Sequence, residues 1–318
     1  MYVEKRKEGK KIKYYLAHSF REGGKVQKIR KFLGKNISDK ELKERVSKAE
    51  KVILEEIEQY KIISDPLKVP LSENEIKFIE RLEINQKLRV FHLSEKQWKL
   101  FSELFTYSTN AIEGSELEQK EVKEILEKDE WPKKSKEDIA ETYGVNEAVE
   151  FIQKTKEHIS LDLILNLHKI VFKNSKNFAG EFRKTGEEVV VGNGLGNVIH
   201  YGAPQSRIIS LLKELIEWYD KNNKKYPGLV LAIVIHNQFE NIHPFRDGNG
   251  RVGRLLLNNI LIKNKLPPIN IDFKNRKEYY SALQEYEKNN NIKPMIDLLL
   301  KEYKSLKKRL GDHKTKGV

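Results

Sequence analysis

The 318-residue chain contains no cysteine, which excludes disulfide bonds, thiol catalysis and zinc sites built on cysteine. It also lacks any apolar run close to the roughly 20 residues that a helix needs to cross a bilayer. Residues 1–15 carry charges where a secretory signal would need an apolar stretch. From these absences we expect a soluble, cytoplasmic protein that makes no contact with a membrane. The length allows one large domain, or a core with a smaller appendage.

Acidic residues are scarce at the two ends of the chain. Residues 1–35 contain twelve Lys or Arg against three Glu, and residues 301–318 contain seven against two acids. The formal net charge of +13 therefore belongs to the ends, because the residues between them sum to −1. A basic arm of this kind is typical of a protein that holds nucleic acid or an acidic partner. A charged surface that contacts only water explains the same composition equally well.

The start of the chain predicts a β-hairpin followed by a helix. Two runs of alternating apolar and polar residues flank Gly23-Gly24, so we expect a basic β-hairpin within residues 1–35. Residues 37–62 have the apolar spacing of one helix, which begins near Ser38 or Asp39. This helix could support a dimer or recruit a target protein.

Beyond residue 73 the apolar spacing is helical almost throughout. The exception is residues 187–201, where two β-branched runs around a Gly/Asn-rich loop predict a second hairpin. The fold class is therefore mainly α. The expected helices cover residues 73–112 and 117–174 with interruptions, then 206–222, 229–242, 251 onward, 276–288 and 293–310. The expected parts are a hairpin appendage (1–35), a helical N-terminal region (36–100), a core (101–300) and a basic C-terminal tail (301–318).

The segment HPFRDGNGRVGR, residues 243–254, concentrates unusual residues before a run of leucines. Pro244 ends the preceding helix and leaves His243 at its C-terminal edge. The turn Gly248-Asn249-Gly250 can present backbone N–H groups to an anion at the start of the next helix. A capping histidine and an ordinary turn are the alternatives for these same residues.

Three charged side chains accompany this turn. Arg251 and Arg254 lie three residues apart, so a helix that begins near Arg251 places both on one face, near its positive end. Asp247 offers a hard oxygen ligand, which suits Mg²⁺ bound together with phosphates. Histidine titrates near neutrality, so His243 can act as a base. Together these residues predict a triphosphate site with a base beside it, although the arginines could also be surface charges.

HPFRDGNGRVGR matches the signature His-Pro-Phe-x-Asp/Glu-Gly-Asn-Gly-Arg-x-x-Arg at every defined position, so the chain resembles the Fic family. The segments GEFRKTGEEVVVG, HNQFENIHPF and RKEYYSAL resemble other core segments of that family in order and spacing. The resemblance covers roughly residues 101–300. It implies a Fic-type helical bundle with a small β-hairpin flap beside the active site.

Fic proteins of this kind transfer AMP from ATP to a Ser, Thr or Tyr hydroxyl of a target protein. By position, the resemblance implies that His243 deprotonates the hydroxyl and that Asp247 holds Mg²⁺. It further implies that Arg251 binds the β-phosphate and Arg254 the γ-phosphate. The full set of residues expected to bind ATP is Glu113, Val191, Gly192, Asn193, Gly194, Asp247, Gly248, Asn249, Gly250, Arg251, Val252, Gly253, Arg254, Tyr279 and Tyr280.

Two of these assignments have structural alternatives. Tyr279 and Tyr280 match a family pair near the adenine, but they could equally be core aromatic residues of a helix. The hairpin 189–201 matches the flap, whose residues 189–192 would pair with an extended target segment by adding a strand. It could also be a hairpin that only covers helices. Gly192 and Gly194 favour the close approach of a backbone or a nucleotide.

A glutamate occupies an unfavourable place near residue 113. The apolar spacing predicts a helix over about residues 101–114, with Gly114 as its stop, so Glu113 lies at the negative end of the helix dipole. A solvated glutamate at a frayed end is the plain interpretation. The segment TNAIEG also resembles the inhibitory pattern Ser/Thr-x-x-x-Glu-Gly/Asn of Fic proteins with an N-terminal inhibitory helix. That resemblance implies a pair between Glu113 and Arg254, and some relatives use the same glutamate to position water and remove AMP.

Two other functions stay open from the sequence. The chain could be a nucleic-acid-binding regulator that uses the basic residues 1–35. It could also be a Fic enzyme that transfers another nucleotide, since base recognition lies outside the motif. The phosphate-transferring branch of the family typically carries Lys at the position of Gly250, so the glycine here favours attack on the α-phosphate. ATP, a target protein and a second copy of the chain are the other expected partners.

Overall fold

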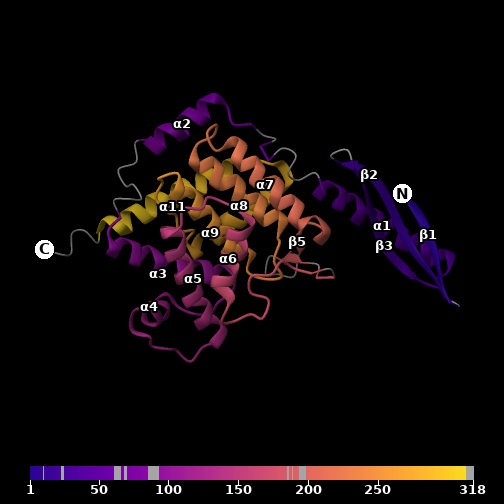
Figure 1. The fold of residues 1–318 in the computed structure, drawn as a ribbon, viewed down its shortest axis with the longest axis horizontal. Coiled ribbons are helices and arrows are strands. Elements are labelled where there is room, and N and C mark those ends of the chain that lie inside the picture. Colours follow the sequence, from indigo (N-terminus) through magenta and orange to yellow (C-terminus); the bar gives the residue numbers. More distant parts are fainter. Residues whose placement is uncertain are drawn as a thin grey trace. The chain divides into compact units, whose positions relative to one another are not determined.

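In the computed structural model the chain forms two compact units, residues 1–64 and 65–318. The described residues are 1–9, 11–22, 25–60, 66–67, 70–84, 93–184, 186–187, 189–192 and 198–312. Figure 1 shows an antiparallel sheet and one helix in the first unit and a helical bundle in the second. Within the described ranges, no helix has the length and apolar character that crossing a bilayer requires.

The first unit is a three-stranded antiparallel sheet with a helix on one face. Its elements are β1 (Tyr2–Glu8), β2 (Lys11–Glu22), β3 (Lys25–Lys35) and α1 (Asp39–Tyr60), and the strand order is β1-β2-β3. Leu16, Ile29 and Leu33 of the sheet form a buried core with Ile53 and Ile57 of α1. The appendage therefore has three strands where a two-stranded hairpin was expected, and the turn Gly23-Gly24 lies outside the described residues.

Helix α1 begins where the sequence predicts. The Ser38 backbone N–H donates to the Glu41 carboxylate at 3.0 Å, and the Glu41 N–H donates to the Ser38 hydroxyl at 3.3 Å. This reciprocal cap satisfies two N–H groups at the helix start. Because the apolar side of α1 packs on the sheet, the first unit extends to Ser64 rather than ending near residue 35.

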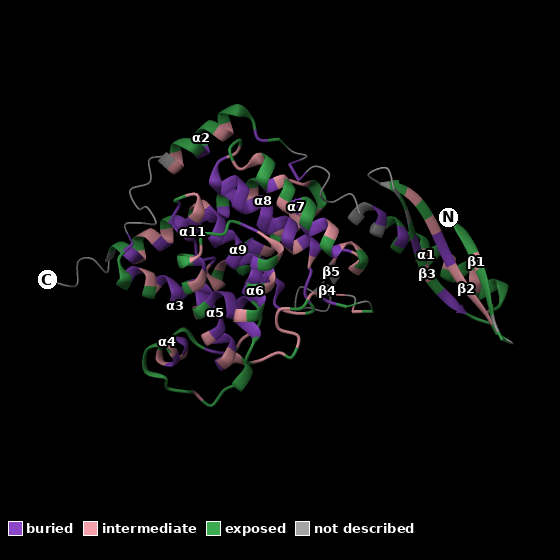
Figure 2. Ribbon diagram, in the orientation of Figure 1, coloured by how far each residue is buried: buried purple, intermediate pink, exposed green. Residues whose placement is uncertain are grey.

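The second unit is a bundle of helices around a buried central pair, α8 and α9 (Figure 2). Its helices are α2 (Glu73–Ile84), α3 (Glu95–Ile112), α4 (Gln119–Lys128), α5 (Lys136–Lys154), α6 (Leu161–Phe172), α7 (Ile208–Asn222), α8 (Gly228–Ile242), α9 (Asn249–Lys263), α10 (Arg276–Asn289) and α11 (Lys293–Asp312). Strands β4 (Val190–Gly192) and β5 (Val198–Tyr201) form the small hairpin. The expected fold, mainly α with one hairpin in the core, is confirmed.

Some boundaries differ from the expected ones for physical reasons. Helix α9 begins at Asn249, two residues before the expected start, so Gly250 lies in its first turn. The segment 301–312 is no tail, because Leu306 and Leu310 of α11 are buried in the bundle. Residues 313–318 of the expected tail lie outside the described part of the chain. At the start of α8, the N–H groups of Gly228 and Leu229 donate hydrogen bonds to the Glu83 carboxylate of α2.

Candidate active site

The loop between α8 and α9 is held in one shape by its own residues. His243 has φ +50° and caps α8, and Gly248 has φ +82° and caps α9. A side chain at Gly248 would overlap the Phe172 ring, whose Cε2 would lie 2.2 Å from the added Cβ. The Asn249 amide accepts from the Phe245 N–H at 2.8 Å and donates to the Phe245 carbonyl at 2.9 Å. The loop is therefore rigid before any ligand binds.

The orientation of His243 suits it to act as a base. Its Nδ1 lies 3.1 Å from the Glu240 carbonyl oxygen, which can only accept, so Nδ1 carries the hydrogen. The lone pair is then on Nε2. His243 lines a cavity of about 290 Å³ together with Asp247, Arg254 and Tyr280. The structure thus brings the predicted base, acid and arginine together.

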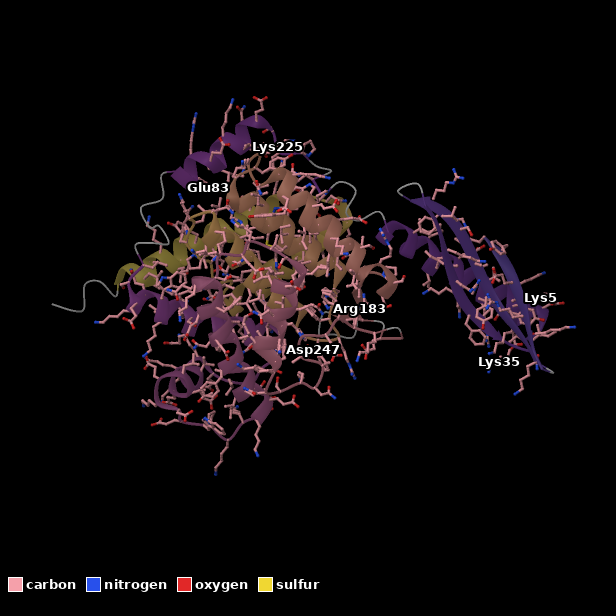
Figure 3. All side chains as sticks on the ribbon, in the orientation of Figure 1. Lys5, Lys35, Glu83, Arg183, Lys225 and Asp247 are labelled. Carbon is pink, nitrogen blue, oxygen red and sulfur yellow. The ribbon has the colours of Figure 1, made fainter. Side chains whose placement is uncertain are left out.

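Arg183, labelled in Figure 3, links His243 to the segment around the flap through hydrogen bonds. It is 3% exposed, and its Nε donates to the His243 carbonyl at 2.9 Å. Its other nitrogens donate to the carbonyls of Glu187 and Ala203, on either side of the β4–β5 hairpin. One buried guanidinium therefore fixes the backbone of the base and both ends of the hairpin.

The start of α9 offers an anion site beside His243. The first N–H groups of a helix have no partner within it, and the positive end of the helix dipole lies there. These groups belong to residues 249–251, because the first intrahelical bond runs from the Val252 N–H to the Gly248 carbonyl at 3.1 Å. The Asn249 side chain is fully used in holding the loop, so only its backbone can serve as a cradle. The Val252 N–H is used by that intrahelical bond, and contacts of Val252 and Gly253 with ATP stay a prediction.

Arg254 is 2% exposed and lies inside a cage of polar groups. Its Nη2 donates to the Glu113 carboxylate at 2.6 Å, and its Nε donates to the Thr109 hydroxyl at 2.7 Å. Burial opposes its charge, but the Glu113 carboxylate, Tyr279 and Glu240 together outweigh burial and raise the pKa of Arg254 above its ordinary value. The expected pair between the loop and the end of α3 is present in the structure.

Gly250 makes this pair sterically possible. A Cβ at residue 250 would lie 2.1 Å from the Glu113 Oε1 atom. The sequence predicted Glu113 as the last helical residue, but α3 ends at Ile112 and Glu113 is its C-cap. Gly114 follows with φ +100°. The Glu113 side chain is 27% exposed at this position. The glutamate therefore enters the site from a helix end and occupies space that a side chain would otherwise fill.

Arg251 is held by a second glutamate, Glu141 of α5. Its Nη1 contacts the Glu141 carboxylate, and both side chains are 7% exposed. The Phe172 ring lies 4.5 Å from the guanidinium carbon, a cation–π contact. Sequence reasoning missed Glu141, because a lone glutamate within a helix carries no local signal.

Asp247 is half-exposed at the mouth of the cradle. Its Oδ1 accepts from the Gly248 N–H at 2.6 Å, and Lys176 and Arg251 approach it at 3.7 and 3.5 Å. Mg²⁺ commonly uses one or two carboxylates together with phosphate oxygens. A single exposed carboxylate beside a phosphate cradle fits that use. Among the described residues, no three His, Asp or Glu side chains form a metal cage of their own.

Tyr279 and Tyr280 line the cavity, but their hydroxyl groups contact Arg254 and the end of α3. Tyr279 is buried; its hydroxyl lies 2.9 Å from His236 Nε2 and 3.4 Å from Arg254 Nη1. The Tyr280 hydroxyl donates to the Ile112 carbonyl at 3.2 Å, so it holds the end of α3. Burial raises the pKa of Tyr280 to about 12. The expected adenine contact stays a prediction.

Two buried titratable groups were not anticipated: Glu240, which lines the cavity, and His236, which contacts Tyr279. Burial lowers the pKa of His236 to about 3, with help from Arg254, so this histidine is neutral. Burial raises the pKa of Glu240 to about 8; Arg254 opposes that shift and Glu113 adds to it. Neither sequence position differs visibly from an ordinary residue of a buried helix.

The flap hairpin is present at the cavity. Val189 lines the cavity, and its carbonyl accepts from the Gly202 N–H at 3.1 Å. In the described part of the chain β4 pairs with β5 alone. Val191 and Gly192 lie in β4, while the expected nucleotide contacts Asn193 and Gly194 lie outside the described residues.

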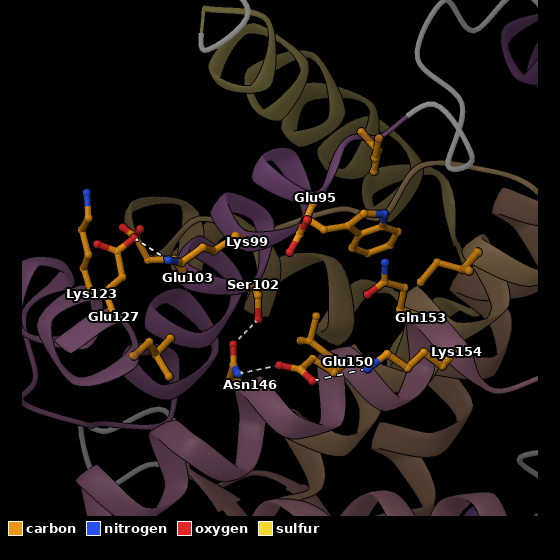
Figure 4. Close-up of a pocket in the computed structure, with 15 residues that line it drawn as sticks. Glu95, Lys99, Ser102, Glu103, Lys123, Glu127, Asn146, Glu150, Gln153 and Lys154 are labelled. Carbon is orange, nitrogen blue, oxygen red and sulfur yellow. Dashed lines mark hydrogen bonds and ion pairs between the residues drawn. The ribbon is translucent and has the colours of Figure 1, made fainter. Parts of the chain in front are cut away.

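A larger cavity of about 840 Å³ lies elsewhere, between α3, α4 and α5 (Figure 4). Its charged groups are mostly paired with each other, for example Lys99 with Glu127 at 3.2 Å and Lys154 with Glu150 at 3.6 Å. Glu95, the first residue of α3, lines it, but Ser94 and Gln97 already cap that helix start, and its described lining contains no histidine, unlike the smaller cavity at His243. The smaller cavity, which His243 and Arg254 line, is therefore the better candidate for the active site.

The chain is similar to known proteins over the segment that contains this site. Residues 158–261 match the sequence model of the Fic/DOC family. Protein adenylyltransferase fic-1 of Caenorhabditis elegans is 32% identical over 221 residues, which are 67% of this chain and 42% of that protein. The probable protein adenylyltransferase aq_aa38 of Aquifex aeolicus is 38% identical over 135 residues, 42% of this chain and 39% of that protein. The chain thus spans less than half the length of these relatives.

Solved structures show the same fold. Residues 134–508 of C. elegans Fic-1 superpose with a TM-score of 0.61 at 25% identity, covering 88% of this chain and 79% of that one. A Fic domain-containing signalling protein of Bacteroides thetaiotaomicron gives a TM-score of 0.60 at 22% identity, covering 74% of this chain and 95% of that one.

Proposed function

Because the chain belongs to the Fic/DOC family, we propose that it is a protein adenylyltransferase that moves AMP from ATP to a Ser, Thr or Tyr hydroxyl of a protein. One observation carries the proposal: a single cavity holds a base, a helix N-terminus and a buried arginine. These are His243, the start of α9 and Arg254. The similarity to protein adenylyltransferases of C. elegans and A. aeolicus supports AMP as the transferred group.

The geometry assigns each residue one task in the transfer. The triphosphate lies along the start of α9, where the N–H groups of residues 249–251 bind its oxygens. Nε2 of His243 takes the proton of the target hydroxyl, and the oxygen forms a bond with the α-phosphorus. The bond from that phosphorus to the β-phosphate oxygen breaks, and pyrophosphate leaves. Arg251 and Arg254 stabilise the charge of the leaving group by preorganised electrostatics.

Asp247 would hold the Mg²⁺ that accompanies ATP. When bound, this ion neutralises part of the phosphate charge. The half-exposed carboxylate beside the cradle supports this role, while Lys176 must yield its contact with Asp247.

Glu113 keeps the enzyme inactive as long as it pairs with Arg254. Arg254, which would bind the γ-phosphate, is paired with the Glu113 carboxylate at 2.6 Å, so the triphosphate cannot take its reactive pose. The same carboxylate could position water for the reverse removal of AMP. Release of the pair turns the transfer on.

The target protein binds along the flap 189–201. An extended segment adds to the edge of β4 and presents its hydroxyl to His243, as in other recognition by strand addition. A homodimer and a cytoplasmic location, both expected from the sequence, stay predictions.

Intact-mass spectrometry of the protein incubated with ATP and Mg²⁺ tests this function. We expect an AMP adduct on the Glu113→Gly protein and none on the Glu113→Gly/His243→Ala protein. An adduct that persists without His243, or a Glu113→Gly protein that stays unmodified both alone and with a cell extract as target source, contradicts the proposal. UTP, GTP and CTP in place of ATP test which base the enzyme selects.

A further inference from the structure

One face of the N-terminal sheet is exposed and strongly basic. Residues directly opposite each other in an antiparallel sheet share a face. Glu4, Tyr15 and Phe32 are opposite one another across the three strands, and so are Tyr2, Ala17 and Arg30. These rows lie on the face opposite to Leu16 and α1, and we call that face the open face. Phe32 is 54% exposed on it.

Positive charge dominates the open face. By the strand register it carries Arg6, Lys11, Lys13, Arg21, Lys28 and Arg30. By the same register two glutamates share this face, Glu4 and, opposite Lys11, Glu8. The Glu4 carboxylate lies within ion-pair distance of three of the cations, Arg6 at 3.7 Å, Lys28 and Arg30. Lys28 and Arg30 both donate to this carboxylate, Arg30 at 2.8 Å. Glu4 therefore fixes the positions of these cations rather than cancelling the charge of the whole face.

Apolar groups are placed between the cations. The rings of Tyr15 and Phe32 lie 5.3 Å apart, and the Arg6 guanidinium lies 5.6 Å from the Tyr15 ring. Val26, near the start of β3, is 65% exposed. A surface with fixed cations and exposed apolar tips suits DNA, where phosphates border a groove that displays thymine methyl groups.

The size of the open face selects the form of nucleic acid. Three strands about 4.8 Å apart span about 10 Å, and twelve residues of β2 extend about 40 Å. The major groove of B-form DNA is about 12 Å wide, whereas the major groove of duplex RNA is too deep and narrow for side chains to read.

We propose that the open face binds double-stranded DNA, with the sheet in the major groove and its Lys and Arg side chains on the phosphates. The proposal rests on residues 1–35 alone and is independent of AMP transfer. Binding at this face would bring a nucleotidyltransferase domain to DNA-bound target proteins.

Fluorescence anisotropy of the full-length protein with a labelled duplex of about 20 base pairs tests this proposal. The test variant is Arg21→Ala/Arg30→Ala, in which Glu4 keeps Lys28 as a partner. The matched control is Lys40→Ala/Lys48→Ala, which removes the same charge from exposed positions of α1. We expect the test variant to bind at least about tenfold more weakly at ~0.1 M salt, and the slope of log affinity against log salt to fall by about 2. The control should bind like the unmodified protein.

Other outcomes overturn the proposal. Equal losses in the two double variants would mean a general charge effect. Tighter binding to single-stranded DNA, duplex RNA or vesicles of anionic phospholipid would assign the face to a different partner. Circular dichroism melting of the Arg21→Ala/Arg30→Ala protein checks that the sheet remains folded. A third variant, Phe32→Ala, keeps every charge, so it should weaken binding without changing the salt slope.

Discussion

Two arginines of α9 are each bound by a glutamate, yet the two pairs differ in construction. Glu113 stands at the end of α3, where the helix dipole disfavours a carboxylate, and its side chain is 27% exposed. Glu141 lies within α5 and is 7% exposed, with Arg251 between it and the Phe172 ring. The first pair can separate without unfolding anything, whereas the second belongs to the packed interior. We infer that Glu113 regulates its arginine and that Glu141 orients its arginine.

Loss of Glu113 should have the largest effect on activity. A hydrogen bond to a charged group contributes about 1.5–3 kcal/mol, so the Glu113→Gly protein should transfer AMP about 10–100 times faster. Radiolabelled AMP incorporation measures this rate. Glu116→Gly, which removes an exposed glutamate three residues away, is the control and should leave the rate unchanged. Equal rates in the Glu113→Gly and unmodified proteins would refute the regulatory role.

Loss of the Glu141 charge should act in the opposite direction. Glu141→Gln, introduced into the Glu113→Gly protein, leaves buried Arg251 with only the half-exposed Asp247 carboxylate, at 3.5 Å, as a counter-charge, and transfer should fall about tenfold. The KM for ATP should rise with little change in folding cooperativity if Arg251 binds the phosphates as proposed. A faster enzyme would instead make Glu141 a second inhibitor and remove the contrast between the two pairs.

The pH dependence of the free energy of unfolding tests the electrostatic interaction of Glu240 with the Glu113–Arg254 pair. Glu240 has a pKa of about 8 when folded and an ordinary value of 4.5, so the folded protein binds the extra proton between these values. Stability should therefore fall as the pH rises through this window, and Glu240→Gln should remove that decline. Thermal melting at several pH values measures it. Removing Glu113 should move the window to lower pH, since the Glu113 charge raises the pKa of Glu240; removing Glu141 should not move it.

The smallest effect is expected at Tyr280. Its hydroxyl donates to the Ile112 carbonyl at the end of α3, and an ordinary hydrogen bond contributes about 0.5–1.5 kcal/mol. Tyr280→Phe should loosen the last turn and raise basal transfer about two- to tenfold. The double variant with Glu113→Gly should show no further rise. An additional rise there would mean that Tyr280 restrains transfer by a route other than Glu113.

The sequence predicted the parts of the site that depend on neighbouring residues in the chain. Pro244 and Gly248 mark the ends of two helices by backbone geometry, and the spacing of Arg251 and Arg254 follows from one helix. The Glu113–Arg254 pair came from a resemblance, since a charge at a helix end does not name its partner. Helix starts were predicted within about two residues where a cap such as Ser38 was present.

What the sequence did not reveal depends on tertiary packing. Glu141, Glu240 and Arg183 become functional because distant segments meet, and each lies in a helix or loop where its residue type is ordinary. The third strand of the N-terminal sheet was missed for a related reason. Residues 2–8 are mostly charged and carry little apolar alternation, and their pairing with β2 is what makes them a strand.

The missing side chain at residue 250 has a consequence for how such a protein can change. Glu113 Oε1 sits where a methyl group would be, so a single codon substitution to alanine would displace the inhibitory carboxylate, and the added methyl group would also lie 3.0 Å from Nη1 of Arg254. A lineage could therefore move from a silenced enzyme to an unrestrained one in a single step, and purifying selection at this position would guard the cell against unchecked modification as much as it would preserve binding of the nucleotide.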